Sequence, residues 1–205
     1  MTKFTHDIRQ SVVTTVVLMI ICGLIFPIFL SGVAGILFPH QAKGSLIEVN
    51  GEVVGAEHVG QKFTEDYFMK GRPSAVDYNT YGPDQDMSEV TPSSGSANYA
   101  PSNPELSKRV EEDINSFLAA NPDVKKEDIP ADLMTASGSG LDPEISPASA
   151  EIQVPALAEA SGISEEKLMS FIEENKKGKL LGIFGEEVVN VLGVNLDIAK
   201  EMGII

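Results

Sequence analysis

The sequence predicts an α+β protein built from a single N-terminal transmembrane helix followed by one extracytoplasmic α+β domain. An uncharged apolar run occupies residues 11–39. Beyond this run, strand-like and helix-like stretches are short and segregated along the chain, which is typical of α+β domains. The only cysteine, Cys22, lies inside the apolar run. The outer domain therefore has no disulfide framework and must be stabilised by its own core.

The apolar run predicts a membrane-spanning helix over residues 11–38. Its centre, VVTTVVLMIICGLIFPIFL, is apolar on all sides. A helix over residues 12–30 rises roughly 28 Å, which is enough to cross the hydrocarbon core. A cleaved signal peptide has a shorter apolar core, and a buried soluble helix carries a polar stripe. An uncleaved anchor is therefore expected, in which Pro27 and Gly32 kink or end the helix.

Flanking charges predict the orientation of this anchor. Lys3 and Arg9 precede the run, whereas Lys43 is the first basic residue after it. The positive-inside rule then places residues 1–10 in the cytoplasm and residues 39–205 outside the cell membrane. Of the chain's net charge of −15, the N-terminal segment with Lys3, Arg9 and Asp7 accounts for +1, which leaves −16 outside. Such a domain repels nucleic acid, so nucleic-acid binding is not expected.

The outer domain opens with a predicted hairpin and an irregular stretch. Residues 46–47 and 53–54 are apolar and flank Asn50-Gly51, the dipeptide that favours a type I′ hairpin turn. An aromatic, amphipathic segment follows and ends at Gly71-Arg72-Pro73. Residues 71–103 are rich in Gly, Pro, Ser and Asn, which indicates either disorder or a functional surface loop. Their three tyrosines favour order, because disordered tracts are poor in aromatic residues.

Capping signals predict helices in the second half. Asn103-Pro104 begins a helix that Asn121-Pro122 ends, with one apolar stripe. The stripe consists of Leu106, Val110, Ile114, Phe117 and Leu118. Ser146-Pro147 begins a second helix that runs to about Ser161, with a kink at Pro155.

Ser164 begins a third helix, with Lys176 and Lys177 at its C-terminal end and Gly178 as its stop. The stretch EEVVNVL predicts a strand, and NLDIAKEM predicts a short final helix. All these elements are short, as an α+β domain requires.

Candidate chemical motifs are weak. His6, His40 and His58 are the only histidines and are spread along the chain, which excludes a Ser-His-Asp triad and disfavours zinc. Residues 164–167 match S-x-x-K, so a membrane-anchored Ser-Lys hydrolase using Ser164 and Lys167 is an alternative, although its companion motifs are absent. Residues Asp84–Glu89 resemble a calcium loop that lacks its glycine. An extracytoplasmic sensing module is a further alternative. Neither a catalytic nor a metal residue is assigned.

The stretch SGSGLDPEISPASA, residues 137–150, is the most distinctive. Its glycines and its helix N-terminus could receive an anion. We favour a turn and a helix cap instead, because turn formation and capping by Ser146 explain every residue type in the stretch. Gly138 and Gly140 are expected to supply backbone angles that other residues avoid.

Six stretches taken together resemble the C subunit of the Kdp potassium-transporting P-type ATPase, and the resemblance covers nearly the whole chain. They are FPHQAKGSLI, GQKF, YFMKGRPSA, SSGSAN, DLMTASGSGLDPEISPASA and VNVLGVNL, in this order. The resemblance implies a single-pass membrane subunit without catalytic activity of its own. It implies three partners: a channel-like potassium-binding subunit, the P-type ATPase subunit and a small single-helix subunit.

The resemblance also implies a set of motif positions with a docking or nucleotide-related role. They are Gly71, Arg72, Pro73, Ser74, Ser137, Gly138, Ser139, Gly140, Leu141, Asp142, Pro143, Ser146, Pro147, Gln153, Asn190 and Asn195. Members of the family are described as catalytic chaperones that raise the affinity of the pump subunit for ATP, so ATP is a ligand implied by resemblance alone. The stretch after Gln153, VPALAEAS, carries Glu159 and no base, which is unfavourable for binding phosphate. No firmly bound cofactor is expected.

Overall fold

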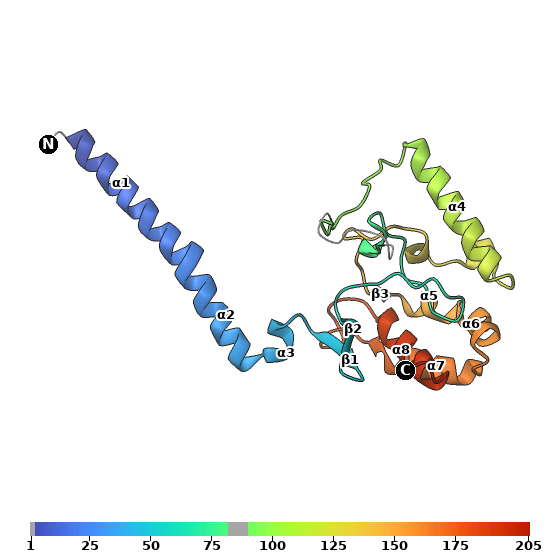
Figure 1. The fold of residues 1–205 in the computed structure, drawn as a ribbon. Helices are drawn as coiled ribbons and strands as arrows, with labels where there is room; N and C mark the ends of the chain where they lie inside the picture. The colour runs from blue at the N-terminus through green and yellow to red at the C-terminus, as the bar shows by residue number, and fades with distance from the viewer. Residues whose placement is uncertain (1–2, 82–89) are drawn as a thin grey trace. The chain divides into compact units, whose positions relative to one another are not determined.

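The computed structural model describes residues 3–81 and 90–205 (Figure 1). The chain divides into two compact units, residues 1–46 and residues 47–205, which are described in turn. The calcium-loop hypothesis for Asp84–Glu89 falls outside the described residues.

The first unit is one long helix with a short extension. It comprises α1 (Lys3–Ile20), a five-residue π-helical turn η1 (Ile21–Ile25), α2 (Phe26–Leu37) and the short α3 (Pro39–Ala42). The π turn directly precedes Pro27, which has no N–H to donate within the helix. Residues Thr5–Leu37 form a helix long and apolar enough to cross a membrane. Gly32 does not end it, and the limits of the membrane-spanning part stay a prediction.

The second unit begins with the predicted hairpin. Strands β1 (Leu46–Val49) and β2 (Glu52–Ala56) pair in a two-stranded sheet. Asn50 and Gly51 both have positive φ, at 54° and 85°, as a type I′ turn requires. The prediction for this segment is therefore confirmed. The aromatic segment that follows is irregular, and Met69 within it is fully buried.

Helix α4 (Pro104–Ala120) has the predicted limits. The side chain of Asn103 accepts a hydrogen bond from the N–H of Glu105, and Asn121 ends the helix. The apolar stripe faces inward but stays half-buried, because few other elements pack against this helix. Three single turns of 3₁₀ helix lie on either side of α4 along the chain: η2 (Asp77–Asn79), η3 (Lys126–Asp128) and η4 (Ala131–Leu133).

The helix expected from Ser146-Pro147 to Ser161 is in fact two helices, α5 (Pro147–Glu151) and α6 (Val154–Ser161). The break falls at Ile152 and Gln153, ahead of the expected kink. Pro155 lies in the first turn of α6, where its missing N–H leaves no helical bond unmade. A short strand, β3 (Glu144–Ile145), precedes α5 and was not predicted.

The C-terminal part corrects two predictions. Helix α7 (Glu165–Glu174) is capped by Ser164 as expected, but Asn175 ends it, and Lys176–Lys177 form strand β4. Gly178 is therefore not the helix stop. Strand β5 (Val188–Asn190) is shorter than EEVVNVL, because the side chain of Asn190 caps α8 (Val191–Glu201) at that point. Strand β5 lies between β3 and β4 and is antiparallel to both.

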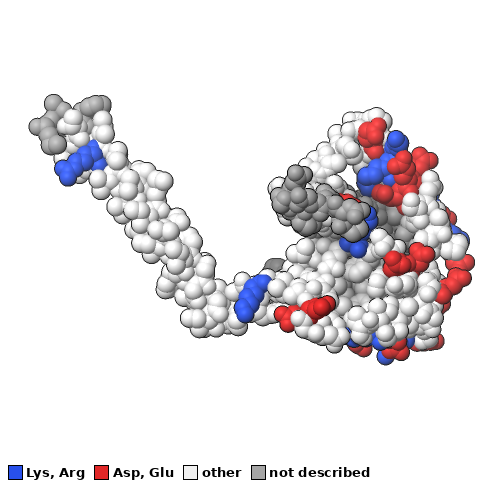
Figure 2. All heavy atoms as spheres, viewed as in Figure 1, with Lys and Arg blue, Asp and Glu red and all other residues white. Residues whose placement is uncertain are grey.

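The core of the second unit lies between this sheet and helices α5 to α8 (Figure 1). Helices α6, α7 and α8 pack on one another, and β5 contacts α5 and α8. Fully buried members include Met69, Val189, Val194 and Ile198. The mixture of short strands and packed helices confirms the α+β class. On the face that Figure 2 shows, acidic side chains are spread widely over the described residues of this unit.

Candidate functional site

Two motif segments far apart in the chain, residues 71–74 and residues 137–143, lie against each other. Nη1 of Arg72 donates to Oδ2 of Asp142 at 2.9 Å, and Nη2 donates to the carbonyl of Thr135 at 3.2 Å. The two charged side chains are about three-quarters buried, at 24% and 27% exposure. Such an ion pair is screened less by solvent than a surface pair and fixes the geometry of both segments.

Serine hydroxyls join the same two segments. Oγ of Ser74 donates to the carbonyl of Gly140 at 2.7 Å and accepts from the backbone N–H of Tyr78 at 3.0 Å. In return, the N–H of Ser137 donates to the carbonyl of Pro73 at 3.2 Å, and its Oγ accepts from the N–H of Gly140 at 2.7 Å. Both hydroxyl oxygens are therefore hydrogen-bonded within the protein, where they join the two segments.

Tyr78 completes this arrangement. Its hydroxyl donates to the carbonyl of Arg72 at 2.6 Å. Burial raises the pKa of Tyr78 to about 12; the nearby Asp142 carboxylate adds to the rise, and Arg72 opposes it. The residue lies within the 71–103 segment, in the part before residue 82 that the structure describes. A Cβ on Gly71 would approach this hydroxyl to 2.8 Å, which explains the glycine there.

Only one of the two glycines of the serine-glycine stretch has the special backbone expected. Gly140 has φ +68°, and a Cβ there would meet Val76 Cγ2 at 2.6 Å and the carbonyl of Gly95 at 2.9 Å. Gly138 does not have positive φ, and a Cβ there would meet nothing within 4 Å. The prediction for Gly138 was therefore wrong: the crowding comes from segments distant in sequence, which only the folded chain brings to position 140.

The remainder of the stretch is packed as a turn. The carbonyl of Leu141 accepts from the N–H of Gly60, and the carbonyl of Pro143 accepts from the N–H of Val191. Oδ1 of Asp142 accepts from the N–H of Glu144, which closes the turn. Ser139 is exposed, and its Oγ accepts from the N–H of Leu141 at 3.1 Å.

The buried side-chain amides of Asn195 and Gln153 hydrogen-bond to the backbone just before Arg72. Oδ1 of Asn195 accepts from the N–H of Met69 at 2.7 Å, and Nδ2 donates to its carbonyl at 3.0 Å. Likewise, Oε1 of Gln153 accepts from the N–H of Lys70 at 2.9 Å, and Nε2 donates to the carbonyl of Lys70 at 3.2 Å. Each amide thus replaces the hydrogen bonds that a neighbouring strand would make. Gln153 is in position because the break between α5 and α6 falls there.

Asn190 joins the hairpin segment to the C-terminal helix. Its Oδ1 accepts from the N–H of Gly193 and caps α8, while Nδ2 donates to the carbonyl of Glu57 at 2.9 Å. Its side chain, like those of Gln153 and Asn195, is buried and has its polar atoms paired within the protein.

Asp132 is a residue that the sequence reasoning missed. Its carboxylate accepts from the N–H and Oγ of Ser146 at 2.8 and 3.1 Å and from Oγ of Ser149 at 2.6 Å. Burial acts to raise the pKa of Asp132, but the hydrogen bonds from Ser146 and Ser149 outweigh it and lower the pKa. The N-terminus of α5, which begins at Pro147, therefore already holds an anion belonging to the protein itself. Its partners lie 14 and 17 residues further along the chain, so tertiary contacts set this arrangement and no local sequence signal marks it.

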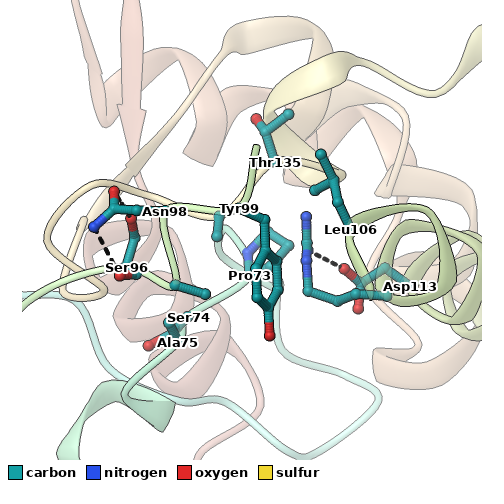
Figure 3. A pocket seen from close by; sticks show the side chains of 12 residues that line it. Pro73, Ser74, Ala75, Ser96, Asn98, Tyr99, Leu106, Asp113 and Thr135 are labelled. Atoms are coloured by element: carbon teal, nitrogen blue, oxygen red, sulfur yellow. Dashed lines mark hydrogen bonds and ion pairs between the residues drawn. The ribbon is translucent and has the colours of Figure 1, made fainter. Parts of the chain in front are cut away.

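A hollow of about 440 Å³ lies between α4 and the motif segments (Figure 3). Side chains from residues 73–75, residues 96–99 and α4 surround it, as Figure 3 shows. Its charged wall is an internal pair: Nη1 of Arg109 bonds Oδ2 of Asp113, and Nη2 donates to the carbonyl of Met134. Burial raises the pKa of Asp113, and Arg109 opposes the rise. The two charged side chains of the hollow are thus already paired with protein groups.

The Ser164–Lys167 pair does not form a catalytic dyad. Oγ of Ser164 accepts from the backbone N–H of Lys167 at 3.3 Å, which is the capping bond. Nζ of Lys167 lies 5.1 Å from the centroid of the Phe171 ring, a cation–π contact. Both groups therefore have structural roles in α7. Within residues 3–81 and 90–205, no group of three or more His, Cys, Asp or Glu side chains could hold a metal ion.

Apart from Asn190, the motif positions belong to one hydrogen-bonded framework that we call the motif clasp: residues 69–78, 132–147, Gln153 and Asn195. The framework orders a long irregular segment over the core. Its side chains bond to one another and to backbone, so the arrangement is suited to holding a surface in shape.

Comparisons with known proteins agree on one family. A family model described as "K+-transporting ATPase, c chain" (KdpC) matches residues 8–200. The potassium-transporting ATPase KdpC subunit of Clostridium kluyveri is 55% identical over 206 residues, covering 100% of this chain and 98% of the relative. The corresponding subunit of Clostridioides difficile is 53% identical, covering 97% and 99%. That of Caldanaerobacter subterraneus is 45% identical, covering 96% of each.

Proposed function

The chain belongs to the KdpC family, the c chain of the K+-transporting ATPase, and from this premise we propose that it is a non-catalytic accessory subunit that stabilises assembly of the transport complex. Its role in potassium transport follows from the family, and its candidate membrane span is the Thr5–Leu37 helix. Within the transport complex, we propose that this subunit contributes to assembly.

The observation that carries the proposal is the pairing within the motif clasp. Ser74, Asp142, Gln153 and Asn195 bond to protein groups. Both terminal nitrogens of Arg72 do so as well, and its Nε, which has no partner among the described residues, is buried. A catalytic serine needs an adjacent base, and a phosphate site needs free cationic donors. The clasp supplies a fixed surface instead, which is what an assembly subunit requires.

We propose that this subunit binds a channel-like potassium-binding subunit, a P-type ATPase subunit and a small single-helix subunit. The anchor would bring residues 39–205 to the outer face of the cell membrane, with residues 1–10 in the cytoplasm, as the basic flank supports. An accessory subunit with this topology would act on the outer and membrane-embedded parts of its partners.

The proposed mode of action does not use ATP bound to this chain. The N-terminus of α5 is occupied by Asp132. A second hollow, beside Gln153, is lined by Asp66 and Glu159 against a single base, Lys70, a balance that is unfavourable for phosphate. A ligand at 100 times its Kd would raise the free energy of unfolding by about 2.7 kcal/mol. We expect ATP to leave the melting temperature of the detergent-solubilised chain unchanged. An ATP-dependent rise that is lost in Ser139→Ala or Gln153→Ala would instead support the chaperone role.

Assembly is tested by affinity purification of the tagged full-length chain in mild detergent, from cells that express all subunits of the ATPase. The expected result is co-purification of the channel-like and P-type subunits, together with loss of potassium uptake at low potassium when this chain is deleted. A chain that purifies alone from a strain with normal uptake would contradict the proposal. A tag placed at the C-terminus, and cleaved by protease added to intact spheroplasts, would verify the orientation.

A further inference from the structure

The connection between β4 and β5 carries an exposed apolar tip that the motif clasp does not use. Residues 179–184 read KLLGIF. Leu180, Leu181, Ile183 and Phe184 are 70%, 82%, 75% and 61% exposed. Soluble surfaces rarely gather large apolar side chains in this way unless they meet a partner. We call residues 179–184 the apolar finger.

The finger has a defined backbone conformation. The N–H of Leu180 donates to the carbonyl of Phe184 at 2.8 Å, and the N–H of Phe184 donates back to the carbonyl of Leu180 at 3.0 Å. Leu181 and Gly182 at its tip have φ of 56° and 74°. A left-handed backbone is unfavourable for leucine. Leu181 nevertheless adopts it, and its side chain is the most exposed of the four.

The base of the finger is fixed to the core. Strands β4 and β5 pair through Lys177 and Val188, and the adjacent Val189 is fully buried. Nζ of Lys177 lies 2.7 Å from Oε1 of Glu57, and Nζ of Lys179 lies 3.4 Å from Oε2 of Glu186. The two lysines nearest the tip are thus already paired with carboxylates, and the base presents no free positive charge to an anionic surface.

The size and charge of the finger restrict what can cover it. Four side chains offer far less than the roughly 1,000 Å² that a stable association in solution requires, so a free second copy is a poor occupant. A small contact suffices only where a partner is already held nearby, because the effective concentration is then high. Glu186 and Glu187 follow the tip and are exposed; the side chain of Glu186 is 86% exposed. Together with the acidic domain, they disfavour an anionic lipid surface.

We propose that the apolar finger docks into an apolar socket with a basic rim on another membrane subunit of the same ATPase. This rests on the proposed function, since the shared complex provides the partner held nearby. The four apolar side chains fill the socket, and Glu187 faces the rim together with Glu186, which keeps 86% of its side chain exposed despite its 3.4 Å contact with Lys179. The finger is separate from the motif clasp, so the two surfaces can be tested independently.

The test uses the complete complex in native membranes. A benzoyl-phenylalanine photo-crosslinker is placed at Leu181, and a control is placed at Met169 on α7, which is 40% exposed. The expected result is an adduct from position 181 with another subunit of the ATPase, identified by mass spectrometry, and no such adduct from position 169. Adducts only with lipid, only with a second copy, or with nothing overturn the inference.

Charge variants test the socket and its rim. Leu181→Asp is expected to lower the amount of co-purified subunits by about tenfold or more, as loss of a central anchor does, with the melting temperature unchanged because the side chain is exposed. The double variant Glu186→Lys, Glu187→Lys should also lower the amount of co-purified subunits. An unchanged amount would contradict the proposal that the socket has a basic rim. Co-purification without a finger adduct refutes only this inference, whereas absence of co-purification by the unaltered chain refutes the proposed function.

Discussion

Asn195 and Met69 lie 126 residues apart in the chain, yet the side-chain amide of the first pairs with both backbone groups of the second. Asn195 is 1% exposed and Met69 is fully buried. The pair therefore joins helix α8 to the segment that leads into the motif clasp, at a place from which water is excluded.

Removal of this amide should be costly. Asn195→Ala leaves the N–H and the carbonyl of Met69 buried without partners, at about 1–3 kcal/mol each. We expect the free energy of unfolding to fall by about 2–5 kcal/mol, measured by urea denaturation of the full chain in detergent followed by circular dichroism. Asn115→Ala, at an exposed position of α4, is the matched control and should change it by less than about 0.5 kcal/mol. Equal effects at the two positions would show that the pair adds nothing.

Gly140 and Gly138 provide a second matched test. Gly140→Ala combines a left-handed backbone with contacts of 2.6 Å to Val76 and 2.9 Å to Gly95, so it should destabilise by at least about 1–2 kcal/mol and weaken assembly of the complex. Gly138→Ala has open space and an ordinary backbone, and should be neutral or stabilise by up to about 1 kcal/mol. Thermal unfolding and co-purification measure the two effects. Tolerance of alanine at 140 would refute the account of the turn.

Acid should weaken the clasp through Asp132. The pKa of this carboxyl is lowered in the folded protein, because hydrogen bonds from Ser146 and Ser149 outweigh burial. Its stabilisation is therefore complete above the unfolded pKa of about 3.9 and is lost as the pH falls through the lower folded value. Melting temperatures from pH 7 down to about pH 3 should fall less steeply in Asp132→Asn than in the unaltered chain. Asp128→Asn, at an exposed position, should leave the slope as it is.

Alkali should act on Tyr78. Burial, reinforced by Asp142, raises the pKa of Tyr78 to about 12. A raised value means that the neutral phenol is favoured in the fold, so its contribution is complete below about pH 10 and is lost as the pH rises through about 12. Spectrophotometric titration should show one phenol ionising late, and Tyr78→Phe should remove that late step. A titration in which every tyrosine of the folded chain ionises near pH 10 would contradict this environment.

Ser164 separates capping from catalysis. Ser164→Ala should lower the stability of the domain by about 0.5–2 kcal/mol, as loss of an N-cap does, while potassium uptake continues. Ser170→Ala on the same helix is the control, since that exposed hydroxyl bonds only a carbonyl within α7, and its effect should be smaller. Loss of uptake with an unchanged melting temperature would restore the hydrolase alternative.

Several features were predictable because their causes lie within a few residues. The type I′ turn at Asn50-Gly51 and the caps Asn103, Ser146 and Ser164 depend on backbone angles and hydrogen bonds that span three or four positions. The anchor follows from composition alone. Where local signals misled, as at Lys176–Lys177, pairing with strand β5, 11 to 13 residues later in the chain, decided the outcome.

The sequence by itself determined the apolar anchor, the hairpin, the starts of α4, α5 and α7 and, through its motifs, the family. Only the tertiary structure decided that Asp132 fills the N-terminus of α5, that Gln153 and Asn195 hold residues 69–70, and that crowding falls on Gly140 rather than Gly138. The physical reason is the separation along the chain between the groups that stabilise each other. A cap or a turn is stabilised by neighbours in the chain, whereas a buried polar group is stabilised by whichever distant partner the packed core brings within hydrogen-bonding distance.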